Sequence, residues 1–213
     1  MFPSYVIISC PPLCTTSPVC HETRQICYNG ITYRADGELS PTGYVDSNFA
    51  ECKDTHHSIE GNIFIVAGGP VSWESKRQET VALSTVEAEY MGFSRAATQA
   101  LWISKYLSKI GLPTLRLIMI HADNNGSISH SLNDKNHWRT KHIDIRHHFV
   151  KDQVKWGNIT FQYIPSSNNI ADLFTKPFPW EKICQFTSEL NLQCNTEGVL
   201  DQGEWWSGLV TKM

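Results

Sequence analysis

Four acidic residues lie in short motifs that place them at the ends of predicted strands or the starts of predicted helices. They are, in chain order, Asp46, Glu89, Asp123 and Asp172, and they are spread across most of the chain. Such acids can converge only if the strands that carry them are neighbours in one sheet. Carboxylates that converge in this way supply the ligands that two-metal phosphodiester chemistry needs. The sequence therefore predicts a divalent-metal site.

Three of these acids also have an ordinary structural interpretation. Asp46 is polar in a strand and can face solvent, and Asp123 is placed to cap a helix that begins near it. Asp172 follows two asparagines and can complement the dipole of a short helix. Each interpretation stays open for a single residue, but the order and surroundings of all four favour a shared site.

The apolar pattern predicts a mixed α/β domain with a five-stranded central sheet flanked by helices. Strands are predicted at 42–50, 61–68, 70–73, 115–121 and 159–164, helices at 84–110 and 141–156, and a last helical turn from 169 to about 174. The first strands follow one another through short turns and suit an antiparallel meander. The later strands alternate with helices, which is typical of a mixed sheet.

Glu87 and Glu89 belong to the same predicted helix but cannot share one role. Residues two apart in a helix point about 200 degrees away from one another. Ser84 and Glu87 match a capping box, in which Ser84 bonds the Glu87 amide and Glu87 reaches back to the Ser84 amide. Glu89 lies beside the apolar stripe that should face the sheet, so Glu89 is the candidate catalytic residue.

Composition limits the class of protein. With 213 residues, 41% of them hydrophobic, the chain can build one globular core. The net charge of -3 argues against binding nucleic acid through a broad basic surface. An odd number of cysteines and no recognisable signal segment favour reduced thiols and an intracellular location, and no apolar run is long enough to cross a membrane.

Three segments are expected: a poorly ordered Cys/Pro-rich leader at 1–27, a folded domain at 28–180 and a C-terminal extension at 181–213. The leader contains a cluster of Cys10, Cys14, Cys20 and His21. This cluster lacks the paired C-x2-C spacing of structural zinc sites. We expect no metal in the leader.

Several ordered motifs resemble one known family. They are GYVD at 43–46, VSWESKRQ at 71–78, TVALSTVEAEYM at 80–91, ADNN at 122–125, RTKHIDI at 139–145 and ADLFTKP at 171–177. Together they make the chain similar to the ribonuclease H domain of the Pol polyproteins of copia-type LTR retrotransposons. The resemblance covers about residues 30 to 179 and implies the ribonuclease H-like fold.

The resemblance also implies an activity and its cofactors. The family cuts the RNA strand of RNA·DNA hybrids with two Mg²⁺ ions, which Mn²⁺ can replace, held by residues that match Asp46, Glu89, Asp123 and Asp172. One ion generates the nucleophile and the other stabilises the leaving oxygen. The implied partner is the reverse transcriptase domain of the same polyprotein, in retrotransposon particles if the full element is expressed. We interpret the chain as a fragment of such an element.

Five residues are candidates for contact with the hybrid: Lys76, Arg77, Asn124, Arg139 and Lys141. Lys76 and Arg77 follow a predicted strand, and the others lie near the third acid or in a basic region, where they can bind phosphates. The alternative interpretation of the basic residues is a solvated helix face.

Two other functions are alternatives to the cleavage of hybrids by a fast enzyme. Many cellular ribonucleases H have a mobile histidine in the loop before the last acid. The matching segment here, 165–169, contains no histidine, so we expect a slower enzyme of the same class. An inactive or domesticated fragment that only binds nucleic acid or protein remains the alternative. A strand-transferring integrase is excluded, because it would need an acid near positions 157–160, which are Gly, Asn, Ile and Thr.

Overall fold

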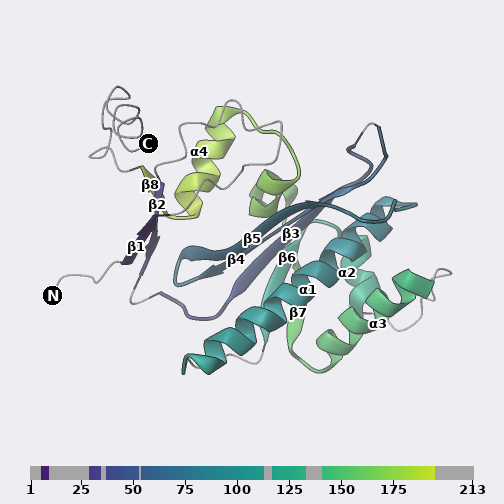
Figure 1. Cartoon of the computed structure of the whole chain (residues 1–213), viewed down its shortest axis with the longest axis horizontal. Coiled ribbons are helices and arrows are strands. Elements are labelled where there is room, and N and C mark those ends of the chain that lie inside the picture. Colours follow the sequence, from purple (N-terminus) through teal and green to yellow (C-terminus); the bar gives the residue numbers. More distant parts are fainter. Residues whose placement is uncertain are drawn as a thin grey trace, which may run out of the picture.

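A five-stranded mixed sheet forms the centre of the molecule (Figure 1). The computed structural model describes residues 6–9, 29–34, 37–52, 54–112, 117–132 and 141–194. The strands lie in the order β5-β4-β3-β6-β7. Their bounds are β3 (Thr42–Asn48), β4 (Ile59–Val66), β5 (Gly69–Arg77), β6 (Ile118–Ala122) and β7 (Ile159–Tyr163). The pairs β3–β4 and β4–β5 are antiparallel, whereas β3–β6 and β6–β7 are parallel. This topology confirms the expected ribonuclease H-like fold.

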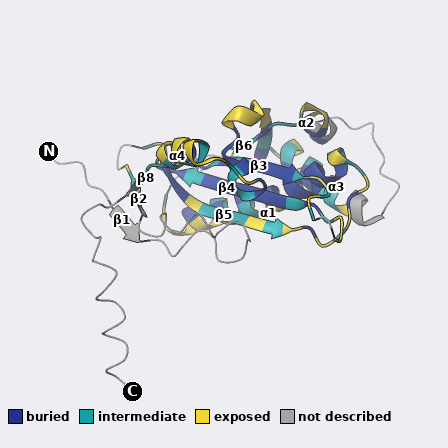
Figure 2. Cartoon of the chain, turned by 90° about the horizontal axis from the view of Figure 1, so that it is seen from above, coloured by how far each residue is buried: buried dark blue, intermediate teal, exposed yellow. Residues whose placement is uncertain are grey.

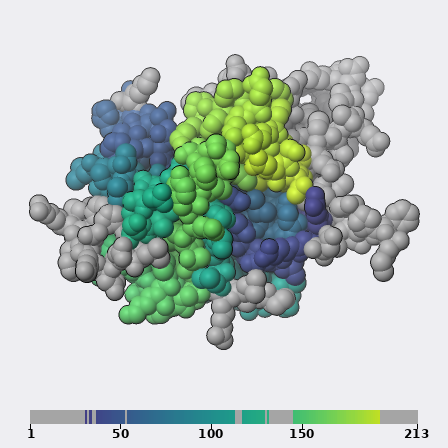
Figure 3. Space-filling view, turned by 180° about the vertical axis from the view of Figure 1, so that it is seen from behind, coloured from purple at the N-terminus to yellow at the C-terminus, as the bar shows by residue number. Residues whose placement is uncertain are grey.

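Helices cover both faces of the sheet. One face carries α1 (Thr85–Lys109), α2 (Asn125–Leu132) and α3 (Lys141–Lys155). The other face carries two 3-10 turns, η3 (Ser166–Asn168) and η4 (Ile170–Phe174), and α4 (Trp180–Glu189). Seen from behind, the yellow-green atoms of α4 lie beside blue and purple atoms from the first part of the folded domain (Figure 3). The predicted helices at 84–110 and 141–156 are thus confirmed.

Strand alternation divides the core into two clusters. Val45 and Phe64 point towards α1, while Ile63 points to the opposite face. The most deeply buried residues lie in the central strands and along the inner side of α1 (Figure 2). The inner side of α1 combines large buried side chains, such as Tyr90 and Phe93, with three fully buried alanines, Ala96, Ala97 and Ala100.

The folded domain continues past the boundary predicted at residue 180. Phe186 and Leu190 of α4 are buried against Ile63 and Ile170. Burial of these side chains makes α4 part of the core on this face of the sheet. The sequence did not predict α4, because its ten residues carry a narrow apolar face that resembles a surface segment.

A second, three-stranded sheet was also not predicted. Its order is β1-β2-β8, with β1 (Val6–Ser9), β2 (Asn29–Tyr33) and β8 (Leu192–Cys194). All its pairs are antiparallel. β1 therefore lies within the predicted leader, whose cysteine cluster falls outside the described residues, as does the chain after 194. Among the described helices, none has the length and apolar content needed to span a membrane.

Replacing Phe186 with Ala tests whether α4 is integral to the domain. The side chain is fully buried, so its removal leaves a cavity in the second core cluster. We expect a loss of about 3–5 kcal/mol in the free energy of unfolding, measured by urea denaturation. The exposed Cys184 of the same helix gives a matched control, and Cys184→Ala should change stability little. Equal effects of both variants would contradict the docking of α4.

Candidate active site

Asp46 lies near the end of β3 and is buried, with 1% of its surface exposed. Its side chain points away from α1, towards η4, where the Thr175 hydroxyl donates a hydrogen bond to Asp46 Oδ2. The interpretation of Asp46 as an outward-facing polar residue is therefore wrong. A buried carboxylate needs hydrogen bonds or a cation to offset its lost hydration.

Gly61 allows the chain after β7 to approach Asp46. It pairs directly with Asp46 across the β3–β4 ladder. A Cβ atom at this position would lie 2.7 Å from Phe174 Cβ, 2.9 Å from Thr175 Cγ2 and 3.0 Å from the Ala171 carbonyl oxygen. Only a glycine leaves room for η4 to pack so closely on the sheet.

Glu89 and Glu87 lie in separate surroundings, as helix geometry predicts. The Ser84 hydroxyl caps α1 by accepting a hydrogen bond from the Glu87 amide at 3.2 Å. The Glu87 carboxylate accepts from the Leu83 amide at 3.0 Å, one residue before the amide that the capping box predicted. Glu89 is also buried, and its Oε2 has no hydrogen-bond partner among the residues that the structure describes.

Asp123 follows the last residue of β6 and is half-buried. Its Oδ2 accepts a hydrogen bond from the Ser166 hydroxyl at 2.6 Å. The cap of α2 is provided by the next residue, because Asn124 Oδ1 accepts from the Ser127 amide at 3.0 Å. The N-cap interpretation of Asp123 is therefore wrong, and its carboxylate is available to the site.

Three of the four predicted acids converge. Each of Asp46, Glu89 and Asp123 offers one carboxylate oxygen, and these oxygens all lie within 4.8 Å of one another. They come together because β3 and β6 are parallel neighbours whose carboxyl ends lie side by side, and because α1 crosses that edge. We call these residues the acidic triad.

Asp172 joins the site through a lysine. It lies in η4, which Asn169 fixes to β3 by donating a hydrogen bond from Nδ2 to the Val45 carbonyl oxygen at 3.0 Å. Lys176 Nζ lies 3.2 Å from Asp172 Oδ1 and 3.4 Å from Asp46 Oδ2. The buried Asp172 thus does more than complement a helix dipole.

Crowding of the carboxylates changes their proton affinity. Burial, followed by the charges of Asp46 and Asp123, raises the pKa of Glu89 to about 9. Burial, followed by the charge of Asp46, raises the pKa of Asp172 to about 7, against the opposing effect of Lys176. Desolvation and like charges both disfavour the ionised form, so this site is electrostatically unfavourable without a cation.

The donor set fits a hard divalent cation. All available ligand atoms in the triad are carboxylate oxygens, which suit Mg²⁺ or Mn²⁺ better than zinc. The buried Glu89 Oε2 has no hydrogen-bond partner in the described part of the protein, and a cation would satisfy it. Glu89, Asp46 and Asp123 are therefore the residues that would hold the first ion.

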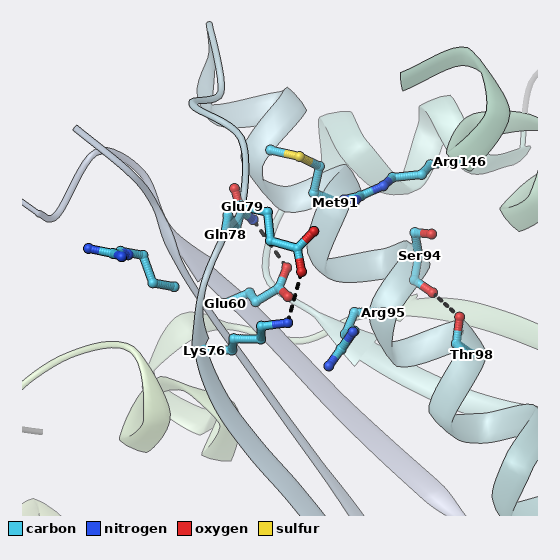
Figure 4. Close-up of a pocket in the computed structure, with 10 residues that line it drawn as sticks. Glu60, Lys76, Gln78, Glu79, Met91, Ser94, Arg95, Thr98 and Arg146 are labelled. Atoms are coloured by element: carbon cyan, nitrogen blue, oxygen red, sulfur yellow. Dashed lines mark hydrogen bonds and ion pairs between the residues drawn. The ribbon is translucent and has the colours of Figure 1, made fainter. Parts of the chain in front are cut away.

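The predicted substrate residues lie in different surroundings. Lys76 pairs with Glu79 at 3.1 Å and, with the exposed Arg77, lines a cavity of about 210 Å³ between β5, α1 and α3 (Figure 4). Asn124 caps α2. Arg139 lies outside the described residues, and so does the side chain of Lys141, the first residue of α3. Their role as hybrid contacts stays a prediction.

Four residues that shape the site have no role predicted from the sequence: Gly61, Asn169, Thr175 and Lys176. Thr175 and Lys176 lie in the 171–177 motif, and the four-residue spacing of Lys176 from Asp172 was the available signal, since such residues face one another in a helix. Gly61 and Asn169 act across the fold, on partners distant in sequence.

Comparison with known proteins identifies relatives of the chain. It is 36% identical over 140 residues to the retrovirus-related Pol polyprotein from transposon TNT 1-94 of Nicotiana tabacum, covering 66% of the chain and 10% of the relative. It is 32% identical over 164 residues to that from transposon RE1 of Arabidopsis thaliana, covering 77% and 11%. The chain thus spans about a tenth of the length of these curated relatives. No family model matches the chain.

Solved structures with a similar arrangement include ribonucleases H. The structure of RNase H1 from the archaeon Halobacterium salinarum NRC-1 has a TM-score of 0.45 at 13% identity, covering 64% of this chain and 94% of that chain. The structure of LC11-RNase H1 in complex with an RNA/DNA hybrid has a TM-score of 0.47 at 14% identity, with the same coverage of both chains.

The raised pKa of Glu89 predicts how stability depends on pH. Without metal, the folded state holds a proton up to about pH 9, whereas the unfolded chain releases it near the ordinary pKa of 4.5. Stability therefore falls as the pH rises between these values. Glu89→Gln removes this dependence, so in EDTA the variant should exceed the wild type in unfolding free energy by at least about 1 kcal/mol at pH 8.

At pH 5 the stability gain of Glu89→Gln should be much smaller, because this pH lies close to the ordinary pKa of 4.5 in the unfolded chain and little of the loss has yet accumulated. Urea denaturation at the two pH values measures it. Glu87→Gln is the matched control, since Glu87 caps the helix and lies outside the triad. A gain that is the same at both pH values would show that the Glu89 carboxylate is not the cause.

Proposed function

We propose that this chain, a ribonuclease H-like domain homologous to the retrovirus-related Pol polyproteins of plant transposons, is an endoribonuclease that cuts the RNA strand of RNA·DNA hybrids. The convergence of Asp46, Glu89 and Asp123 at one edge of the sheet carries the proposal. Such a cluster is costly to fold unless it serves to bind cations. Asp172 completes the set that the family motif requires.

The described residues support hydrolysis of a phosphodiester. Two Mg²⁺ ions, when bound, supply an activated water and stabilise the charge on the leaving oxygen. Asp46 belongs to the acidic triad and also shares the Lys176 ammonium with Asp172, so it is the residue that would serve both ions. The Thr175 hydroxyl fixes one oxygen of Asp46, and the Ser166 hydroxyl fixes one oxygen of Asp123. Hydrogen bonds of this kind orient ligands before the metal arrives.

The rest of a Pol polyprotein is the natural partner. This chain carries a net charge of -3, so phosphate contacts alone are expected to give it weak affinity for a hybrid. A reverse transcriptase domain in the same polyprotein would hold the hybrid and raise its local concentration at the site. This partnership suits the small share of the relatives' length that the chain covers.

Cleavage of a labelled RNA·DNA hybrid tests the activity. The wild type should cut only the RNA strand, in Mg²⁺ or Mn²⁺, and should leave RNA·RNA and DNA·DNA duplexes intact. Asp123→Asn removes a metal ligand but preserves the size of the side chain, so we expect its rate to fall by at least about a hundredfold. Failure of a folded, metal-saturated wild type to cut would favour the alternative of an inactive binding module.

The predicted role of Lys76 and Arg77 leads to a separate test. If each of the two residues neutralises one phosphate, then changing either one to Gln should make the slope of log K for hybrid binding against log[salt] shallower by about one. Fluorescence anisotropy of a labelled hybrid at several salt concentrations measures this slope. Lys105→Gln, at an exposed position of α1, is the control, and an equal effect there would contradict a specific contact.

A further inference from the structure

The four carboxylates form two overlapping groups. The acidic triad of Asp46, Glu89 and Asp123 brings its oxygens within 4.8 Å of one another. A second group is the pair Asp46 and Asp172, and this pair is bridged by the Lys176 ammonium at 3.4 and 3.2 Å. Asp46 belongs to both groups. Among the described residues, the protein thus places a lysine in one half of the site, and no ion pair with a basic side chain joins Glu89 or Asp123 in the other half.

The backbone fixes Lys176 at this position. Its amide donates a hydrogen bond to the Asp172 carbonyl oxygen at 3.0 Å, so the two side chains lie one helical turn apart. The neighbouring Thr175 bonds Asp46 directly. Thr175 and Lys176, which are adjacent in this turn, thus both contact carboxylates of the site. An isolated ion pair on the surface would not need both contacts.

The Lys176 ammonium can move from the site into solvent. About a third of the Lys176 side chain is exposed, at 34%, while the side chains of Asp46 and Asp172 are almost fully buried. A flexible side chain with this exposure can swing into water without unfolding the turn that carries it. The two acids cannot follow, so they remain as ligands.

We propose that Lys176 is a tethered cation that occupies the Asp46–Asp172 half of the centre and has to leave before a divalent ion binds there. An ammonium and a divalent ion repel each other and compete for the same oxygens. The triad half therefore binds its ion first, and the second ion binds more weakly. Lys176 is a positioning residue, and the inference rests on the metal-dependent function proposed above.

Mn²⁺ binding to the full chain tests the inference without an activity assay. Titrations followed by electron paramagnetic resonance and calorimetry should find one tighter and one weaker ion in the wild type. Lys176→Met keeps most of the length of the side chain but removes the charge. We expect it to tighten the weaker ion by at least about tenfold and to change the tighter ion by less than about threefold.

Two further variants separate competition from a general effect of charge. Lys182→Met removes a nearby positive charge whose Nζ bonds the Ser167 carbonyl oxygen and no carboxylate of the site. It should leave both affinities unchanged. Lys176→Arg retains the charge and should keep the second ion weak. Circular dichroism confirms that each variant is folded, and Lys176→Gln replaces Lys176→Met if the latter does not fold.

Each possible result decides the question. If Lys176→Met leaves the weaker affinity unchanged, or weakens both ions, then Lys176 only anchors η4 and the inference fails, while hybrid cleavage by the wild type can still stand. If Lys182→Met tightens the second ion as much, the effect is general and the inference also fails. If no variant binds Mn²⁺, both the inference and the proposed metal-dependent function fail.

Discussion

Parallel pairing of β3 with β6 is the constraint on which the site depends. The register Tyr44↔His121 aligns the two strands so that Asp46 and Asp123 reach the same edge of the sheet. Strands in this arrangement need a long connection, which here runs through β4, β5 and α1, and α1 brings Glu89 to the edge. A shift of one residue in this register would turn one acid to the opposite face and separate the triad.

The site is unfavourable in isolation, and its neighbours offset the cost. Like charges and burial oppose ionisation of Glu89 and Asp172. Hydroxyl groups from Thr175 and Ser166, together with the Lys176 ammonium, stabilise the remaining charge. Electrostatic destabilisation of this kind is typical of functional sites, because a sequence selected only for stability would have apolar groups in place of the acids.

Local patterns were sufficient to predict much of this arrangement. The periods of apolar residues gave five strands and the two longer helices, and helix geometry separated Glu89 from Glu87, as the Leu83 and Ser84 contacts of the cap confirm. The identity of the fold as ribonuclease H-like depended on the family resemblance. Spacing alone cannot tell a metal ligand from a helix cap, as the neighbours Asp123 and Asn124 show.

The features that could not be predicted from the sequence depend on contacts between distant parts of the chain. Gly61 is informative only once β4 is known to lie under η4, and Asn169 only once its partner is known to be the Val45 carbonyl oxygen. The helix α4 escaped prediction for the same reason, since Phe186 is buried by residues far earlier in sequence. Pairing of β2 with β1 and β8 likewise joins both ends of the described chain.

Dependence on η4 also fixes when the centre can exist during protein synthesis. Asp46 and its hydrogen-bond partner Thr175 are separated by 129 positions, so a ribosome delivers the first acid long before the last. The strands that carry Asp46 and Asp123 can pair on a nascent chain, but Asp172 and Lys176 arrive only with the final turn. A copy that is interrupted before this turn retains most of the sheet and lacks a complete centre.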